Sequence, residues 1–184
     1  MEHLELVARL AGARIGATFN QYAASELRRE RLGAYLAARE GAETILVGEA
    51  AGYRGARISG LAFTSERQLT GSGPAEASAT IVHRVLAELG LEEGVLLWNA
   101  VPTHPGTTHS NRRPTRAEVA AAKPFLAELA RGRRVVAVGR VAAEALDAPS
   151  IRHPSHGGAQ AFAEGLRAAF ATIPPRRVTR ALFL

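Results

Sequence analysis

Residue types capable of chemistry occur in three polar stretches of the sequence. The stretch VGEAAGYRGARISGLAF, residues 47–63, places Glu49 among closely spaced glycines and arginines; LWNAVP contains Asn99, and HPSHGG begins with His153. A carboxylate can orient water, an amide offers both a donor and an acceptor, and an imidazole can donate or accept a proton. Glycines let the backbone approach a ligand closely. These residue types suit a binding site for a polar ligand, provided that the three stretches converge.

Strands and helices are predicted to alternate along the chain. Short apolar runs predict buried strands at residues 44–47, 95–98, 135–138 and 148–152. Helical spacing and capping signals predict helices over residues 22–40, 74–89, 115–131, 140–147 and 158–171. Thr115 and Glu118 form a capping box at the start of the third of these helices. The alternation is typical of a parallel sheet that is covered by helices on both faces.

Each polar stretch follows a predicted strand. Glu49 follows the first strand, Asn99 follows the second, and His153 follows the last. In open α/β sheets, ligands bind beyond the carboxyl ends of the strands. We therefore expect the three stretches to meet at one edge of the sheet and to form one site.

The composition is that of one basic globular domain. The 184 residues, with 47% apolar content, suit a single domain over 1–184, in which residues 1–41 form a helical segment packed on the rest. The net charge is +6, and every one of the 23 basic residues except Lys123 is an arginine. Arginine suits phosphate oxygens, so a polyanionic partner is one explanation. A GC-rich coding sequence is an equally weighted alternative.

The sequence also excludes some classes of site and location. It contains no cysteine, which excludes disulfides, thiolate metal ligands and a thiol nucleophile. The first residues, MEHLELVARL, lack the pattern of a signal peptide, and no apolar run is long enough to span a membrane. We therefore expect a cytoplasmic monomer with no membrane partner.

Four ordered pieces of the sequence resemble the motifs of the uracil-DNA glycosylase superfamily. They are GEAAGYRGARISGLAF (48–63), LWNAVP (97–102) followed by NRRPTRAEVAAAKPFLAEL (111–129), VVAVGRVAAEAL (135–146), and HPS (153–155). The resemblance implies a three-layer α/β/α sandwich around a four-stranded parallel sheet. It also implies a DNA glycosylase of base excision repair, which hydrolyses the N-glycosidic bond of a flipped deaminated base, most simply uracil. The implied partner is double- or single-stranded DNA, with no cofactor and no metal.

The resemblance assigns roles to residues of these motifs. Asn99 would read the Watson–Crick edge of the base, Phe63 would stack on the base, and His153 would donate a hydrogen bond to its carbonyl oxygen as the bond breaks. Glu49 would orient water and stabilise the sugar cation, since it matches a glutamate of the thermostable iron-sulfur branch. Other residues implied to contact the base are Gly48, Ala50 and Gly52.

Residues beside the motifs are implied to contact the DNA backbone. They are Arg54, Arg57, Pro102, Arg112, Arg113, Ser155, His156 and Gly157. The arginines would add positive charge at the rim of the site, and the glycines would permit close approach of the backbone to phosphates. On this interpretation, the loop of residues 48–60 forms a cradle for the nucleotide.

The sequence departs from the family pattern at several positions. Ala50 stands where the most active branch carries an aspartate that positions water, and Gly52 stands where the uracil-restricted branch carries a tyrosine. The glycine predicts a roomier pocket. Thr103 and Ala122 lie near two ligand positions of the iron-sulfur branch, so no cluster can form and residues 100–124 must be held by packing and by the helix cap. We therefore expect a divergent member, nearest to the iron-sulfur branch.

Each assignment has an alternative. Asn99 could bond to its own turn, and Phe63 could be an ordinary core residue. His153 could cap a loop, and Glu49 could accept loop amides as scaffold. A damaged-DNA binding protein with weak or no catalysis is the second hypothesis, because Ala50 removes a water-positioning group. The third is a metal-dependent hydrolase that uses His104, His109, His153 and His156.

Overall fold

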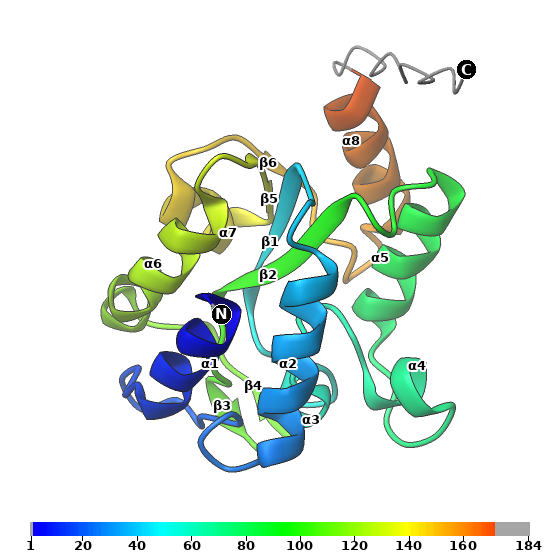
Figure 1. The fold of residues 1–184 in the computed structure, drawn as a ribbon. Coiled ribbons are helices and arrows are strands. Elements are labelled where there is room, and N and C mark those ends of the chain that lie inside the picture. Colours follow the sequence, from blue (N-terminus) through cyan, green and yellow to red (C-terminus); the bar gives the residue numbers. More distant parts are fainter. Residues whose placement is uncertain (1, 172–184) are drawn as a thin grey trace, which may run out of the picture.

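The fold is built around a four-stranded parallel sheet with the strand order β2-β1-β5-β6 (Figure 1). The computed structural model describes residues 2–171. The strands of this sheet are β1 (Thr44–Ala50), β2 (Val95–Val101), β5 (Arg134–Val138) and β6 (Ser150–Ile151). The last strand is shorter than the predicted 148–152, whereas the other three are longer than predicted. The parallel sheet and its helical layers confirm the predicted α/β sandwich.

Helices cover both faces of the sheet (Figure 1). The first face carries α1 (Glu2–Gly12), α2 (Glu26–Ala38), α6 (Arg116–Ala130) and α7 (Arg140–Leu146). The second face carries α5 (Ala77–Glu88) and α8 (Ala159–Ala171). Among residues 2–171, no helix combines the length and the apolar character that crossing a membrane requires.

The alternation of side chains along the strands divides the core into two clusters. In β1, Ile45 and Val47 pack with the helices of the first face, whereas Leu46 packs with those of the second. Successive residues of a strand point to opposite faces, so a strand that is buried on both sides needs consecutive apolar residues. The run ILV of β1 meets this requirement.

Four short elements lie in the connections that leave the carboxyl end of the sheet. After β1 come α3 (Ala56–Ser59) and α4 (Glu66–Thr70), and after β2 comes the hairpin of β3 (Gly106–Thr107) and β4 (Ser110–Asn111). The sequence did not predict these elements, because each spans too few residues to show a helical or strand period. They shape the loops around the predicted site.

Two predicted helix starts are wrong by several residues. The helix predicted from residue 22 begins at Glu26, because the Ser25 side chain accepts a hydrogen bond from the third backbone amide after it and acts as the N-cap. The helix predicted from Pro74 begins at Ala77. A proline is tolerated in the first helical turn, but it does not require the helix to begin there.

The connection between β2 and α6 is held by packing and by one buried carboxylate, as predicted for residues 100–124. Thr115 and Glu118 form the predicted capping box. The Glu118 carboxylate also accepts two hydrogen bonds from Arg112, at 2.6 and 2.8 Å, and one from the backbone amide of Ala17 at 3.3 Å. Glu118 thus joins the helix start, the residue that follows the hairpin and the N-terminal segment.

Replacing Glu118 with glutamine is expected to lower the free energy of unfolding by about 3 kcal/mol at neutral pH. The hydrogen bonds from Arg112 hold the pKa of Glu118 at about 2, below the usual 4.5. Because the folded-state pKa is depressed, this stabilisation is complete above the usual pKa and is lost as the pH falls toward 2. Urea unfolding of the wild type and Glu118→Gln across this pH range measures the difference.

Glu128→Gln is the matched control on the same helix. Glu128 pairs with Arg9 at 2.6 Å, but both side chains are partly exposed. Exposed ion pairs contribute only about 0–1 kcal/mol, so this variant should retain the wild-type dependence of stability on acid. An unchanged acid dependence in Glu118→Gln would show that the buried pair does not contribute as inferred.

Candidate active site

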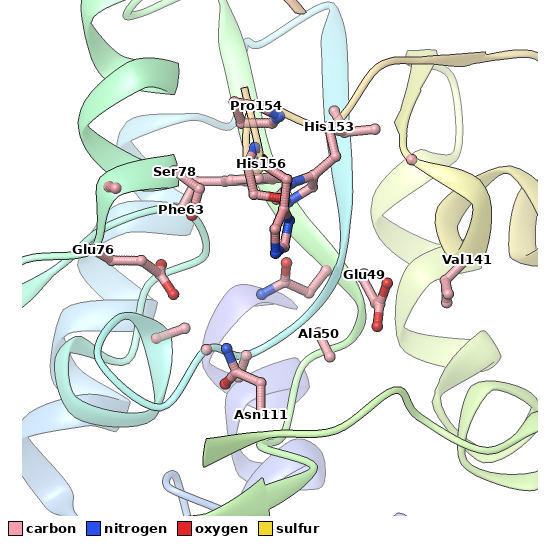
Figure 2. Close-up of a pocket in the computed structure, with 18 of the residues that line it drawn as sticks. Glu49, Ala50, Phe63, Glu76, Ser78, Asn111, Val141, His153, Pro154 and His156 are labelled. Atoms are coloured by element: carbon pink, nitrogen blue, oxygen red, sulfur yellow. Dashed lines mark hydrogen bonds between the residues drawn. The ribbon is translucent and has the colours of Figure 1, made fainter. Parts of the chain in front are cut away.

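A large pocket, with a volume of about 1080 Å³, opens at the carboxyl end of the sheet (Figure 2). Its walls come from the loops that follow β1, β2, β5 and β6 and from the start of α5. Asn99, Phe63 and His153, which lie far apart in the sequence, all line it. The three polar stretches therefore converge in one site.

The floor of the pocket depends on the absence of a side chain at Gly48. In the pairing of β1 with β2, Gly48 lies opposite Asn99. A Cβ atom at Gly48 would overlap the ring of Phe63 and would lie 2.8 Å from the Asn99 Oδ1 atom. Phe63 reaches this place with a φ of 51°, in the left-handed region that bulky side chains seldom adopt. Gly48 thus does not line the pocket itself but makes room for two side chains that do.

The Asn99 amide has no hydrogen-bond partner among the described residues, although only 5% of the residue is exposed. Its amide atoms are not among the side-chain atoms of residues 2–171 that are buried without a partner, so they are accessible from the pocket. The alternative, a bond between Asn99 and its own turn, does not occur in residues 2–171. The amide is therefore available to a ligand in the pocket.

His153 is held by its own loop in a defined orientation. Its Nδ1 atom accepts a hydrogen bond from the backbone amide of Ser155 at 3.1 Å and lies 2.8 Å from the Ser155 hydroxyl oxygen. With Nδ1 as an acceptor, the proton of the neutral ring is on Nε2. Burial, with help from the charge of Arg152 and from His156, lowers the pKa of His153. The ring therefore offers a neutral N–H donor at neutral pH.

Glu49 lies near the end of β1 and lines the pocket beside Ala50. Burial raises the pKa of Glu49, and the nearby Arg113 and Arg140 oppose this shift. Within residues 2–171, no loop amide donates a hydrogen bond to its carboxylate. The structure therefore does not support the alternative in which Glu49 is a scaffold for the loop.

The arginines predicted to contact DNA differ in their partners. Arg54 is exposed at the rim of the pocket. Arg112 and Arg113 also line the pocket, but Arg112 is paired with Glu118 at 2.6 Å and Arg113 with Glu144 at 3.0 Å. Since the Arg112 pair is partly buried, a substitution there would change stability as well as charge.

Two predicted DNA contacts lie outside the pocket. The Arg57 guanidinium stacks on Phe19, at 5.3 Å from the ring centroid. Pro102 is buried, and its carbonyl accepts a hydrogen bond from the Gln21 side chain at 2.7 Å. Neither residue lines the pocket. Both lie away from the pocket lining, and their contacts with DNA stay predictions.

The other predicted residues lie at the pocket. Ala50 and Gly52 line the side formed by the first loop, and Ser155, His156 and Gly157 line the side formed by the last loop. His156 and Gly157 have φ values of 52° and 75°, so the chain turns sharply there. The Gly158 backbone amide donates a hydrogen bond to the Ser155 carbonyl at 3.1 Å across this turn.

Several polar residues of the pocket were not predicted from the sequence. Arg140 and Arg152 add positive charge, and Asn111 accepts a hydrogen bond from the Tyr53 backbone amide at 2.8 Å. Glu76 enters from the start of α5. Arg152 directly precedes the HPS motif, which is a sequence signal that could have identified it. Glu76 lies outside every motif and has no such signal.

The histidines do not assemble a metal site among the described residues. His104 is fully buried, and its Nδ1 and Nε2 atoms lie 2.6 and 2.7 Å from the carbonyl oxygens of Ala51 and Thr107. Both ring nitrogens are thus engaged by the backbone. His104 ties the glycine loop to the hairpin after β2, and it is not free to bind a metal.

Comparison with known proteins identifies the family. The sequence matches the family described as the Uracil DNA glycosylase superfamily over residues 37–182. The wild-type SMUG2 crystal structure from Pedobacter heparinus is similar, with a TM-score of 0.65 and 13% identity, over 92% of this chain and 97% of that one. The wild-type UNG structure from Nitratifractor salsuginis gives a TM-score of 0.47 and 18% identity, over 92% and 94% of the two chains. No curated protein sequence matches the chain. The match over residues 37–182 shows that the chain belongs to the uracil DNA glycosylase superfamily.

Proposed function

We propose that the protein is a DNA glycosylase that hydrolyses the N-glycosidic bond of a deaminated base, most simply uracil. The observation that carries this proposal is the amide of Asn99, which no group of residues 2–171 pairs with, beside the ring of Phe63 at the floor of one pocket. The amide can match the imino and carbonyl groups of a pyrimidine edge, and the ring can stack on the base. A base reaches such a floor only after it has left the DNA stack.

The other pocket residues supply the chemistry of bond cleavage. The Nε2–H group of His153 donates to a carbonyl oxygen of the base, where negative charge develops in the transition state. Glu49 orients a water molecule toward the C1′ atom of the sugar and stabilises the positive charge there. The water oxygen bonds to C1′ and gives one proton to the Glu49 carboxylate, while the C1′–N bond breaks and the base leaves with the electron pair as an anion.

DNA binding is expected to rest on the rim of the pocket. Arg54 and Arg152 lie there, and neither is ion-paired within residues 2–171. Phosphate contacts of this kind position DNA without reading its sequence. All of the proposed site residues come from one chain, so we propose that the protein acts on DNA as a monomer.

The test is base release from single- and double-stranded oligonucleotides that contain uracil, hypoxanthine or other deaminated bases opposite several partners. We expect abasic sites with at least one of these bases, and unchanged activity in the presence of a chelator. His153→Ala is expected to lower kcat by about 10²–10³-fold, since one donor to the developing anion is lost. Its affinity for undamaged DNA should stay at the wild-type value.

Absence of release with every base, together with selective binding of damaged DNA, would favour the damaged-DNA binding protein instead. Ala50 lines the pocket and cannot position water, which is the observation in favour of that second candidate. Loss of activity with chelator would favour the metal-dependent hydrolase.

A further inference from the structure

The backbone of Phe63, whose ring lies at the floor of the pocket, has a costly conformation. Its φ of 51° falls in the left-handed region, which bulky side chains seldom adopt. In this conformation the ring lies so close to Gly48 that a Cβ atom there would overlap it. Strained backbone of this kind persists only where the surrounding structure holds it. The contacts around Phe63 therefore decide whether the ring is present at the floor.

Two hydroxyl groups bind the backbone carbonyls on either side of Phe63. The Ser59 hydroxyl donates to the carbonyl oxygen of Thr64 at 2.6 Å and to that of Leu61 at 3.2 Å, and it accepts a bond from the Leu61 amide at 3.1 Å. The Thr64 hydroxyl donates to the Ala62 carbonyl at 3.1 Å. Ser59 and Thr64 are both buried, so water does not compete for these bonds. The hydroxyl groups thus close the turn from within.

His83 joins this turn to α5. Its Nε2 atom lies 3.1 Å from the Thr64 Oγ1 atom. Because the Thr64 hydroxyl gives its only proton to the Ala62 carbonyl, its oxygen is the acceptor and the Nε2–H group of the imidazole is the donor. Burial lowers the pKa of His83, and a hydrogen bond with the Phe63 backbone opposes this shift. The neutral ring is thus bonded to Phe63 and to the residue that follows it.

Ser59, Thr64 and His83 do not line the pocket. None of them therefore touches a bound base, and the pocket residue that they surround is Phe63. Small changes in the position of such a residue have large effects, because a displacement of about 1 Å can lower a rate about 10²-fold.

We propose that His83 is a positioning residue, which holds the ring of Phe63 at the floor of the pocket through the hydroxyl group of Thr64. This step rests on the proposed function, in which the ring stacks on the base. When the imidazole or the hydroxyl is removed, the strained backbone of Phe63 relaxes and the ring leaves its place beside Gly48. The base then loses its stacking partner.

The first test compares matched substitutions at positions 83 and 64. The amide nitrogen of glutamine reaches the place of the imidazole Nε2 atom, whereas the shorter side chain of asparagine does not. His83→Asn should therefore lower kcat/KM by about 10–100-fold for the base that the wild type releases fastest, and His83→Gln should retain most of the activity. Thr64→Val should show the same loss, whereas Thr64→Ser keeps the hydroxyl and should not. Wild-type activity in His83→Asn would overturn the proposal.

A double-mutant cycle separates positioning from a general loss of structure. Phe63→Leu removes the aromatic ring, so His83→Asn and Thr64→Val should cause no further loss of kcat/KM in that background. A merely structural role would lower kcat/KM by the same factor with and without the ring, and would overturn the proposal. The control is Thr80→Val, which removes an exposed hydroxyl group of α5 outside the pocket and should keep the wild-type activity.

The Hα protons of Gly48 provide a second readout, which does not require activity. Because the Phe63 ring lies against Gly48, its ring current shifts the NMR signals of these protons. In His83→Asn and Thr64→Val the signals should move toward their positions in Phe63→Leu, whereas His83→Gln should keep the wild-type positions. If the wild type releases no base, the proposed function fails, and this movement still supports the positioning role of His83. Unchanged Gly48 signals in His83→Asn would overturn it.

Discussion

Asn99→Ala is expected to lower kcat/KM for base excision by about 10³-fold or more, with little change in the affinity for undamaged duplex DNA. The amide lines the pocket and has no partner among residues 2–171, so on the proposed function its hydrogen bonds are made with a base in the pocket. A site that is built to pair with such groups discriminates strongly when the pairing is lost. Single-turnover excision with each candidate base, together with titration of undamaged duplex, measures the two quantities.

Asn99→Asp serves as the matched variant because it keeps the shape of the side chain. A carboxylate cannot donate a hydrogen bond to a base carbonyl oxygen, so this variant should lose activity to a similar degree. Wild-type excision by Asn99→Ala would contradict the assignment. An equal loss of affinity for undamaged DNA would instead indicate that the substitution disturbs the loop.

The fold could be predicted from the sequence because its signals are local. The run ILV in β1 and the run VLLW in β2 need burial on both faces, and the helices between the strands show a helical period. The ends of the helices were predicted less accurately. The start of α2, for example, is set by the hydrogen bond that the Ser25 side chain accepts from the Arg28 amide, and the composition of the segment does not reveal this bond. Very short elements such as α3 and the hairpin carry no period to read.

The sequence could place candidate site residues in one pocket where they lie near the carboxyl ends of strands or within the quoted motifs. Asn99 lies near the carboxyl end of β2 and His153 follows β6, so the topology alone brings them to one edge of the sheet. For a residue away from the strand ends, the role depends on which way its side chain points in the fold, and the sequence does not specify this. Glu76 could have capped its own helix, and Arg112 could have faced solvent. Their contacts with the glycine loop and with Glu118 appear only in three dimensions.

The remaining question for the proposed chemistry is whether a glutamate at position 49 can activate water without an aspartate at position 50. Ala50 lines the pocket and offers only a methyl group. The Glu49 carboxylate accepts no hydrogen bond from residues 2–171, so all of its acceptor capacity is available to water. Arg113 and Arg140 oppose the effect of burial and favour its ionised form. On the proposed function, Glu49 therefore orients the nucleophile without a second acidic group.

Glu49→Gln is expected to lower kcat by about 10²–10³-fold and to change the pH dependence of excision. Burial raises the pKa of Glu49, so in the wild type the active, ionised form is lost as the pH falls through a value above the usual 4.5. Glutamine has the same shape but does not titrate in this range, so the residual activity of the variant should lack this acidic limb. Single-turnover rates across the acidic range, with DNA in excess of its dissociation constant at each pH, separate this effect from weaker binding. A variant with the wild-type rate and the wild-type acidic limb would show that Glu49 does not activate water, and that cleavage depends on stabilisation of the leaving base by His153 alone.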